Sequence, residues 1–161
     1  MVEQHPHSRR RDGPGHSGGV TSEDPAAEGR RRADALLRLL ADDDAAGIER
    51  LLAELTEVRD LVFTGAGLTA TARAEARTLP PAQRAQANSR QERLGLLRNA
   101  NAANPDGLRI WLRRAAEEVL LIRSQQAVAD RVIAADQEWT ATRAAADANG
   151  TAAASSAATT T

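Results

Sequence analysis

Apolar residues recur every three or four positions through most of this chain, which is the period of a helix buried along one side. The first such run follows Pro25, whose missing N–H suits the first position of a helix; its apolar members are Ala33, Leu36, Leu37 and Leu40. After the acidic stretch 42–44, which can cap the next helix, a second run contains Ile48, Leu51, Leu52, Leu55, Val58 and Val62. The two runs predict a helical hairpin, in which Gly65-Ala66-Gly67 ends the second helix.

The middle of the chain is less patterned. Residues 68–79 are mostly Ala, Thr and Arg, and Pro80-Pro81 interrupts them. Residues 82–93 favour a helix in composition but contain no apolar residue larger than Ala. This stretch is therefore either a solvated helix or a linker. The sequence Asn104-Pro105-Asp106-Gly107 then predicts a turn.

The strongest pattern lies in the last predicted helix, at about 107–147. Its apolar seam advances in alternating steps of four and three, which is a heptad repeat, through Leu108, Leu112, Ala115, Val119, Ile122, Gln126, Ala129, Ile133, Asp136 and Thr140. The stripe is widened by Trp111, Leu121, Val128, Val132 and Trp139, a width that suits a bundle. Because the weaker middle segments are too short to cover it, we expect self-association through Leu108, Leu112, Val119, Ile122, Gln126 and Ile133.

Two glutamines interrupt this seam, Gln126 on it and Gln125 on its shoulder. A polar residue at such a position can fix the register or oligomeric state of paired helices, in which case Gln126→Leu would stabilise the assembly. Alternatively, this turn is exposed where two helices splay or a shorter neighbour ends. We favour the second interpretation.

These patterns together predict an all-α fold, a helical bundle with an N-terminal helical hairpin and a long C-terminal heptad-patterned helix. Residues 25–148 are expected to form a single helical domain. Residues 1–24, which are rich in Gly, Pro, His and charge, and the low-complexity stretch 149–161 are expected to be disordered tails.

Composition restricts the chemistry of the chain. Hydrophobic residues make up 42% of its 161 positions, but the chain has one Phe, two Trp and no Tyr, so its core buries little area per residue and a partner is expected to help. There is no Cys, and the histidines His5, His7 and His16 all lie in the predicted tail. Glu118 is expected to pair with Arg114, one turn earlier. We assign no catalytic, cofactor-binding or metal-binding residue, and do not expect an enzyme.

Charge is distributed unevenly although the formal net charge is -1. Residues 42–61 carry seven acids and two Arg, residues 73–114 nine Arg and three acids, and residues 115–148 three Arg and six acids. We favour mutual neutralisation of these segments by packing. The alternative is an anionic partner such as nucleic acid, contacted by Arg84, Arg90, Arg93 and Arg98. Such binding would be weak and salt-sensitive, because the acidic segments compete for the same arginines.

The stretch Leu61-Val62-Phe63-Thr64-Gly65-Ala66-Gly67-Leu68-Thr69-Ala70 resembles the glycine-rich phosphate turn of dinucleotide-binding folds, and its Thr-Gly-Ala-Gly core resembles the sirtuin turn. That resemblance implies a pyrophosphate bound at a helix N-terminus. The residues before the glycines have helical and not strand periodicity, and no second strand follows. We therefore interpret the glycines as a helix end followed by a new N-cap at Thr69, and expect no specific nucleotide binding.

No stretch of about 18 apolar residues predicts a membrane span, and the N-terminus lacks the apolar region of a signal peptide, so we expect a cytoplasmic protein. The predicted function is a non-enzymatic helical interaction module, such as a self-associating scaffold, adaptor or assembly component. Its partner would be a second copy or another helical protein, and no cofactor is implied. The alternative is a nucleic-acid-associated protein that uses the Arg-rich segment 73–114.

Overall fold

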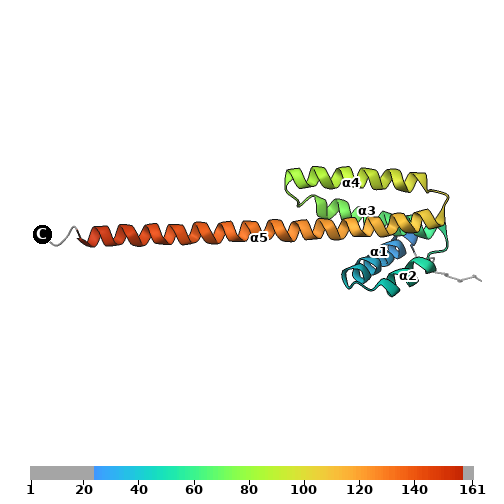
Figure 1. Cartoon of the computed structure of the whole chain (residues 1–161), viewed down its shortest axis with the longest axis horizontal. Helices are drawn as coiled ribbons and strands as arrows, with labels where there is room; N and C mark the ends of the chain where they lie inside the picture. Colours follow the sequence, from blue (N-terminus) through green and yellow to red (C-terminus); the bar gives the residue numbers. More distant parts are fainter. Residues whose placement is uncertain (1–23, 158–161) are drawn as a thin grey trace, which may run out of the picture.

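The computed structural model describes residues 24–157, and all regular secondary structure in that range is α-helical. The elements are α1 (Pro25–Ala41), α2 (Ala45–Glu54), α3 (Val58–Ala76), α4 (Pro81–Ala100) and α5 (Pro105–Ala157). The first four gather around the N-terminal part of α5, and the rest of α5 extends alone away from them (Figure 1). We call residues 24–126 the head and α5 beyond Gln126 the arm. The predicted all-α fold with a long C-terminal helix is confirmed.

The first two helices form the expected hairpin because acidic residues cap both. The Asp24 carboxylate accepts a hydrogen bond from the N–H of Ala26 at 3.0 Å, and Asp44 accepts one from Gly47 at 2.9 Å. Each cap satisfies an N–H that the first turn of a helix cannot pair internally. Asp43 has a φ of 54°, in the left-handed region that Asp tolerates better than most residues. The acidic stretch 42–44 is therefore both the turn and the cap, as the sequence predicts.

The predicted second helix is wrong in its extent. It ends at Glu54, the chain bends, and α3 begins at Val58. The bend contains neither Gly nor Pro, and a distant side chain stabilises it. Arg109 of α5 donates to the carbonyl oxygens of Leu52 and Leu55, each at 3.0 Å, and so satisfies acceptors at the C-terminus of α2.

The glycines predicted to end a helix lie in the middle of α3, where they permit close helix packing. A Cβ atom added to Gly65 would lie within 3.0 Å of three carbon atoms of the Trp111 indole on α5. On the α1 side, a Cβ atom on Gly29 would lie 2.5 Å from the carbonyl oxygen of Phe63, and one on Gly67 would also crowd α1. Gly29 of α1 and Gly67 of α3 thus let α1 approach α3 closely, and Gly65 lets α5 approach the same central helix.

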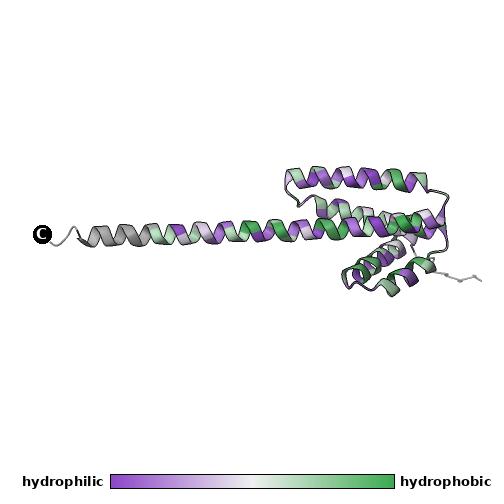
Figure 2. Cartoon of the chain, viewed as in Figure 1, coloured by the Kyte–Doolittle hydropathy of each residue, from purple (hydrophilic) through white to green (hydrophobic). Residues whose placement is uncertain are grey.

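The core is built mainly from Leu and Ala, with Ile48, Val119, Ile122 and a single aromatic residue, Trp111. The helix α4 contributes only Ala87 to the buried set, with Leu94 and Leu97 packed against its edge. Figure 2 shows α4 as largely hydrophilic along its length. Residues 82–93 are thus a solvated helix, the first of the two predicted alternatives.

The arm is a single helix that continues to Ala157, inside the low-complexity stretch 149–161. The predicted N-terminal tail lies outside the described residues except for Asp24, which caps α1. In the part of the chain that the structure describes, no helix combines the length and the apolar character needed to cross a membrane.

Candidate functional site

Most of the seam predicted to mediate self-association lies inside the head. The side chains of Leu108, Leu112, Val119 and Ile122 have no exposed surface, because α5 is the helix against which the head assembles. These four residues are corrected from interface to core. Ile133 remains exposed on the arm.

Gln126 lies at the level where α3 ends. Its side-chain amide donates to the carbonyl oxygen of Glu75 at 2.7 Å and also contacts the Thr78 hydroxyl. Glu75 is in the last turn of α3, where carbonyl groups lack partners within the helix. The polar interruption of the seam therefore coincides with the end of a shorter neighbour, as the favoured interpretation states, but both glutamines are half-buried and not exposed.

A different line of apolar residues on α5 is exposed along both head and arm. It consists of Ile110, Leu121, Val128, Val132 and Trp139, whose exposed fractions range from 41% to 64%. At 100° per residue these five side chains fall within about 40° of one another around the helix. We call them the exposed line of α5. In Figure 2, green segments recur along the part of α5 that no other helix covers.

Charged residues flank the exposed line at heptad spacing. With Val132 and Trp139 at position a, Arg131 and Glu138 occupy position g, and Asp136 and Arg143 occupy position e. The Arg143 guanidinium lies 5.4 Å from the centre of the Trp139 ring. Among the residues whose side chains are described, none of these four charged groups forms an ion pair. They are available to a partner helix.

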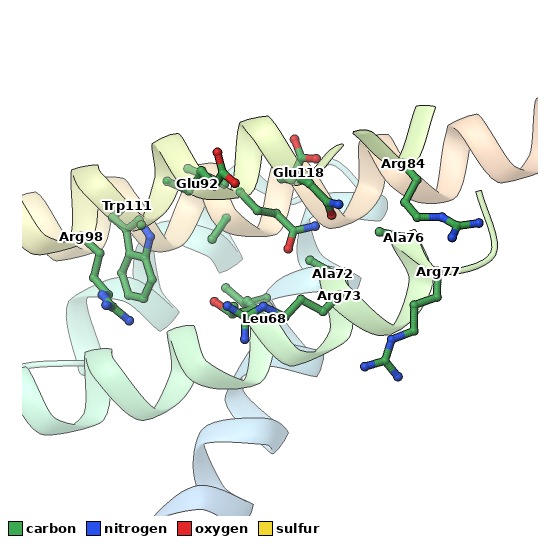
Figure 3. Close-up of a pocket in the computed structure, with 16 residues that line it drawn as sticks. Leu68, Ala72, Arg73, Ala76, Arg77, Arg84, Glu92, Arg98, Trp111 and Glu118 are labelled. Atoms are coloured by element: carbon green, nitrogen blue, oxygen red, sulfur yellow. The ribbon is translucent and has the colours of Figure 1, made fainter. Parts of the chain in front are cut away.

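The second candidate surface is a cleft of about 560 Å³ between α3, α4 and α5. Four arginines line it: Arg73 from α3, Arg77 directly after the end of α3, and Arg84 and Arg98 from α4. Figure 3 shows them at intervals along the cleft, with Leu68, Ala72 and Trp111 among the apolar residues between the helices.

Arg90 is bound within the head. Its Nε atom donates to both Glu118 carboxylate oxygens, at 3.0 and 2.8 Å, and its Nη2 atom lies 3.4 Å from the Gln125 oxygen. Glu118 is only 6% exposed, so this pair is largely removed from water. Glu118 therefore pairs with Arg90 and not with Arg114, the partner expected from the sequence. Because it is bound to Glu118, Arg90 is not a free anion contact. Of the other three candidates, Arg84 and Arg98 line the cleft, and Arg93 is exposed outside it.

Several basic and acidic segments neutralise each other across the head. Arg123 pairs with Glu75 at 2.8 Å and Arg113 with Glu49 at 3.3 Å. The favoured explanation of the uneven charge is therefore correct for these arginines. No described carboxylate forms an ion pair with the arginines Arg73, Arg77, Arg84, Arg93, Arg98 and Arg114.

Within residues 24–157, no group of three or more His, Asp or Glu side chains converges in a way that could hold a metal ion. No known protein family, curated protein or solved structure matches this chain.

Proposed function

We propose that this protein is a non-enzymatic helical interaction module that self-associates by packing the exposed line of α5 against a second copy. The exposed line is the observation that carries the proposal. Burying a Val or Leu side chain contributes about 1.5–3 kcal/mol, and a large aromatic such as Trp139 also contributes strongly to interfaces. The arm extends roughly 45 Å beyond the head at 1.5 Å per residue, which is enough for several turns of contact.

The flanking charges favour a parallel pair in register. In that arrangement each g residue faces the e residue five positions later on the partner helix. Arg131 then meets the partner's Asp136, and Glu138 meets the partner's Arg143, so both kinds of contact are attractive. In the antiparallel register centred between Val132 and Ala135, only Arg131 and Glu138 would meet as opposite charges. A parallel pair also places Leu121, at position d of the same heptad frame, against its own copy, whereas Ile110 falls at position g beside the contact.

Sedimentation equilibrium of the full chain at micromolar concentration tests self-association. We expect a dimer mass, which Val132→Glu should reduce to that of a monomer because it places a charge in the contact. Ala134→Glu is the matched control, since it lies about 200° around the helix from Val132. A strict monomer that keeps full helicity would refute the proposal, and so would equal effects of the two variants.

Cysteine cross-linking tests the orientation, and the absence of native Cys makes it clean. In a parallel pair Thr142→Cys faces its own copy and should oxidise to a covalent dimer. In the antiparallel register Thr142 lies opposite Gln125, roughly 25 Å from its own copy at 1.5 Å per residue. A dimer that cross-links only when Thr142→Cys is mixed with Gln125→Cys would contradict the parallel arrangement but leave self-association intact.

Nucleic-acid association through residues 73–114 has less support. Arg90 is bound by Glu118, and Arg109 caps the end of α2. The aromatic side chain of this segment, Trp111, is 3% exposed and has no face on which a base could stack. Self-association therefore remains the first proposal.

A further inference from the structure

The cleft between α3, α4 and α5 exists because small residues face each other across it. The α3 side presents Ala72 and Ala76, and the α4 side presents Gly95, where an added Cβ would meet nothing within 4 Å. Its volume of about 560 Å³ lies in the range of pockets that hold small molecules. Leu68 and Trp111 lie buried beneath its floor, and the half-buried Leu94 and the methylene groups of the lining arginines give it accessible apolar surface.

The charge of the cleft is positive. Arg73, Arg77, Arg84 and Arg98 line it without an ion pair to any described carboxylate, whereas the acidic lining residues are Glu92 and Glu118. Glu118 is already neutralised by the two hydrogen bonds from Arg90. Guanidinium groups bind carboxylate and phosphate oxygens well, because their planar array of N–H donors matches those groups.

We infer that this cleft binds a small amphipathic anion, an apolar body that carries a carboxylate, sulfonate or phosphate group. The apolar body lies against the half-buried Leu94 and the methylene groups of the lining arginines, above the buried side chains of Leu68 and Trp111, and the anionic group binds the guanidinium groups. A nucleic acid fits less well, since its phosphodiester backbone has no apolar body to place between the helices. This site is separate from the exposed line of α5 and does not depend on self-association.

A pair of matched dyes tests the site in the full chain. Anilinonaphthalene sulfonate is an amphipathic anion, and N-phenylnaphthylamine has the same ring system without the sulfonate. We expect saturable fluorescence enhancement by the anionic dye, one molecule per chain, with an affinity about tenfold or more above that of the neutral dye, as expected for hydrogen bonds to a charged group. Equal affinity for both dyes would overturn the proposal.

Three variants locate the binding. Arg84→Gln should weaken binding of the anionic dye by about tenfold, whereas Arg93→Gln, on the same helix but outside the cleft, should leave it unchanged. Gly95→Leu should block the cleft while the chain stays folded, because Leu is the better helix former and finds open space there.

The Val132→Glu variant shows whether the dye binds in the cleft or on the exposed line of α5. This variant changes only the exposed line, so it should bind the dye as the unmodified chain does. Undiminished dye binding by Gly95→Leu would overturn the site. A loss in Arg93→Gln as large as that in Arg84→Gln would show attraction to general surface charge and would also overturn it.

Discussion

Substituting alanine for Gly65 should destabilise the protein, whereas the same change at Gly95 should stabilise it. Both glycines lie inside helices, Gly65 in α3 and Gly95 in α4. They differ in what a Cβ atom would meet. At Gly65 it would lie within 3.0 Å of three atoms at the outer edge of the Trp111 indole, and at Gly95 it would meet nothing within 4 Å.

The two effects that act on Gly65→Ala have opposite signs. Replacing an interior helical glycine by alanine gains about 0.5–1 kcal/mol from helix propensity alone. Overpacking a filled core costs about 1–3 kcal/mol, and the upper part of that range applies here because Trp111 is buried and packed against a helix backbone. The net loss at Gly65 is therefore about 1–2 kcal/mol, while Gly95→Ala keeps the gain of about 0.5–1 kcal/mol.

Urea denaturation followed by circular dichroism measures both free energies of unfolding. Adding Trp111→Phe to Gly65→Ala should recover part of the loss, because the phenylalanine ring does not reach as far as the outer edge of the indole. The double-mutant cycle should show a favourable coupling of about 1 kcal/mol. If Gly65→Ala were as stabilising as Gly95→Ala, the close packing of Trp111 on α3 would be refuted.

The remaining predictions concern polar groups of the head. Gln126→Leu should lower the free energy of unfolding by about 1 kcal/mol, because the bond to the Glu75 carbonyl is lost; a higher oligomer mass in sedimentation would instead restore the register interpretation. Glu118→Gln should lower the free energy of unfolding, measured by urea denaturation, by about 1–3 kcal/mol. This is less than the full cost of breaking a buried ion pair, because Arg90 is partly exposed. Arg114→Gln, its control, should stay within about 0.5 kcal/mol. Fluorescence anisotropy with unrelated DNA and RNA duplexes should show at most weak binding that disappears between about 50 and 200 mM salt. Sequence-selective binding at the higher salt would favour the alternative function.

Local signals in the sequence are sufficient for the type of secondary structure and for some helix ends. Pro25 after Asp24, and the acidic stretch 42–44, start their helices with groups that lie within a few residues of the N–H groups they satisfy. The heptad spacing of the last helix is likewise a property of neighbouring residues. Such features depend on interactions within one turn, so the chain order alone predicts them.

Only the tertiary structure decides which part of that heptad helix is core and which is surface. The same repeat continues through Ile122 and Ile133, yet the first is buried and the second exposed, because α3 ends level with Gln126. The pairing of Glu118 with Arg90 and the bend held by Arg109 also join segments far apart in the chain. The spacing of apolar residues indicates that a helix has a buried side, but the length of the helices packed against it determines how far along the helix that burial extends.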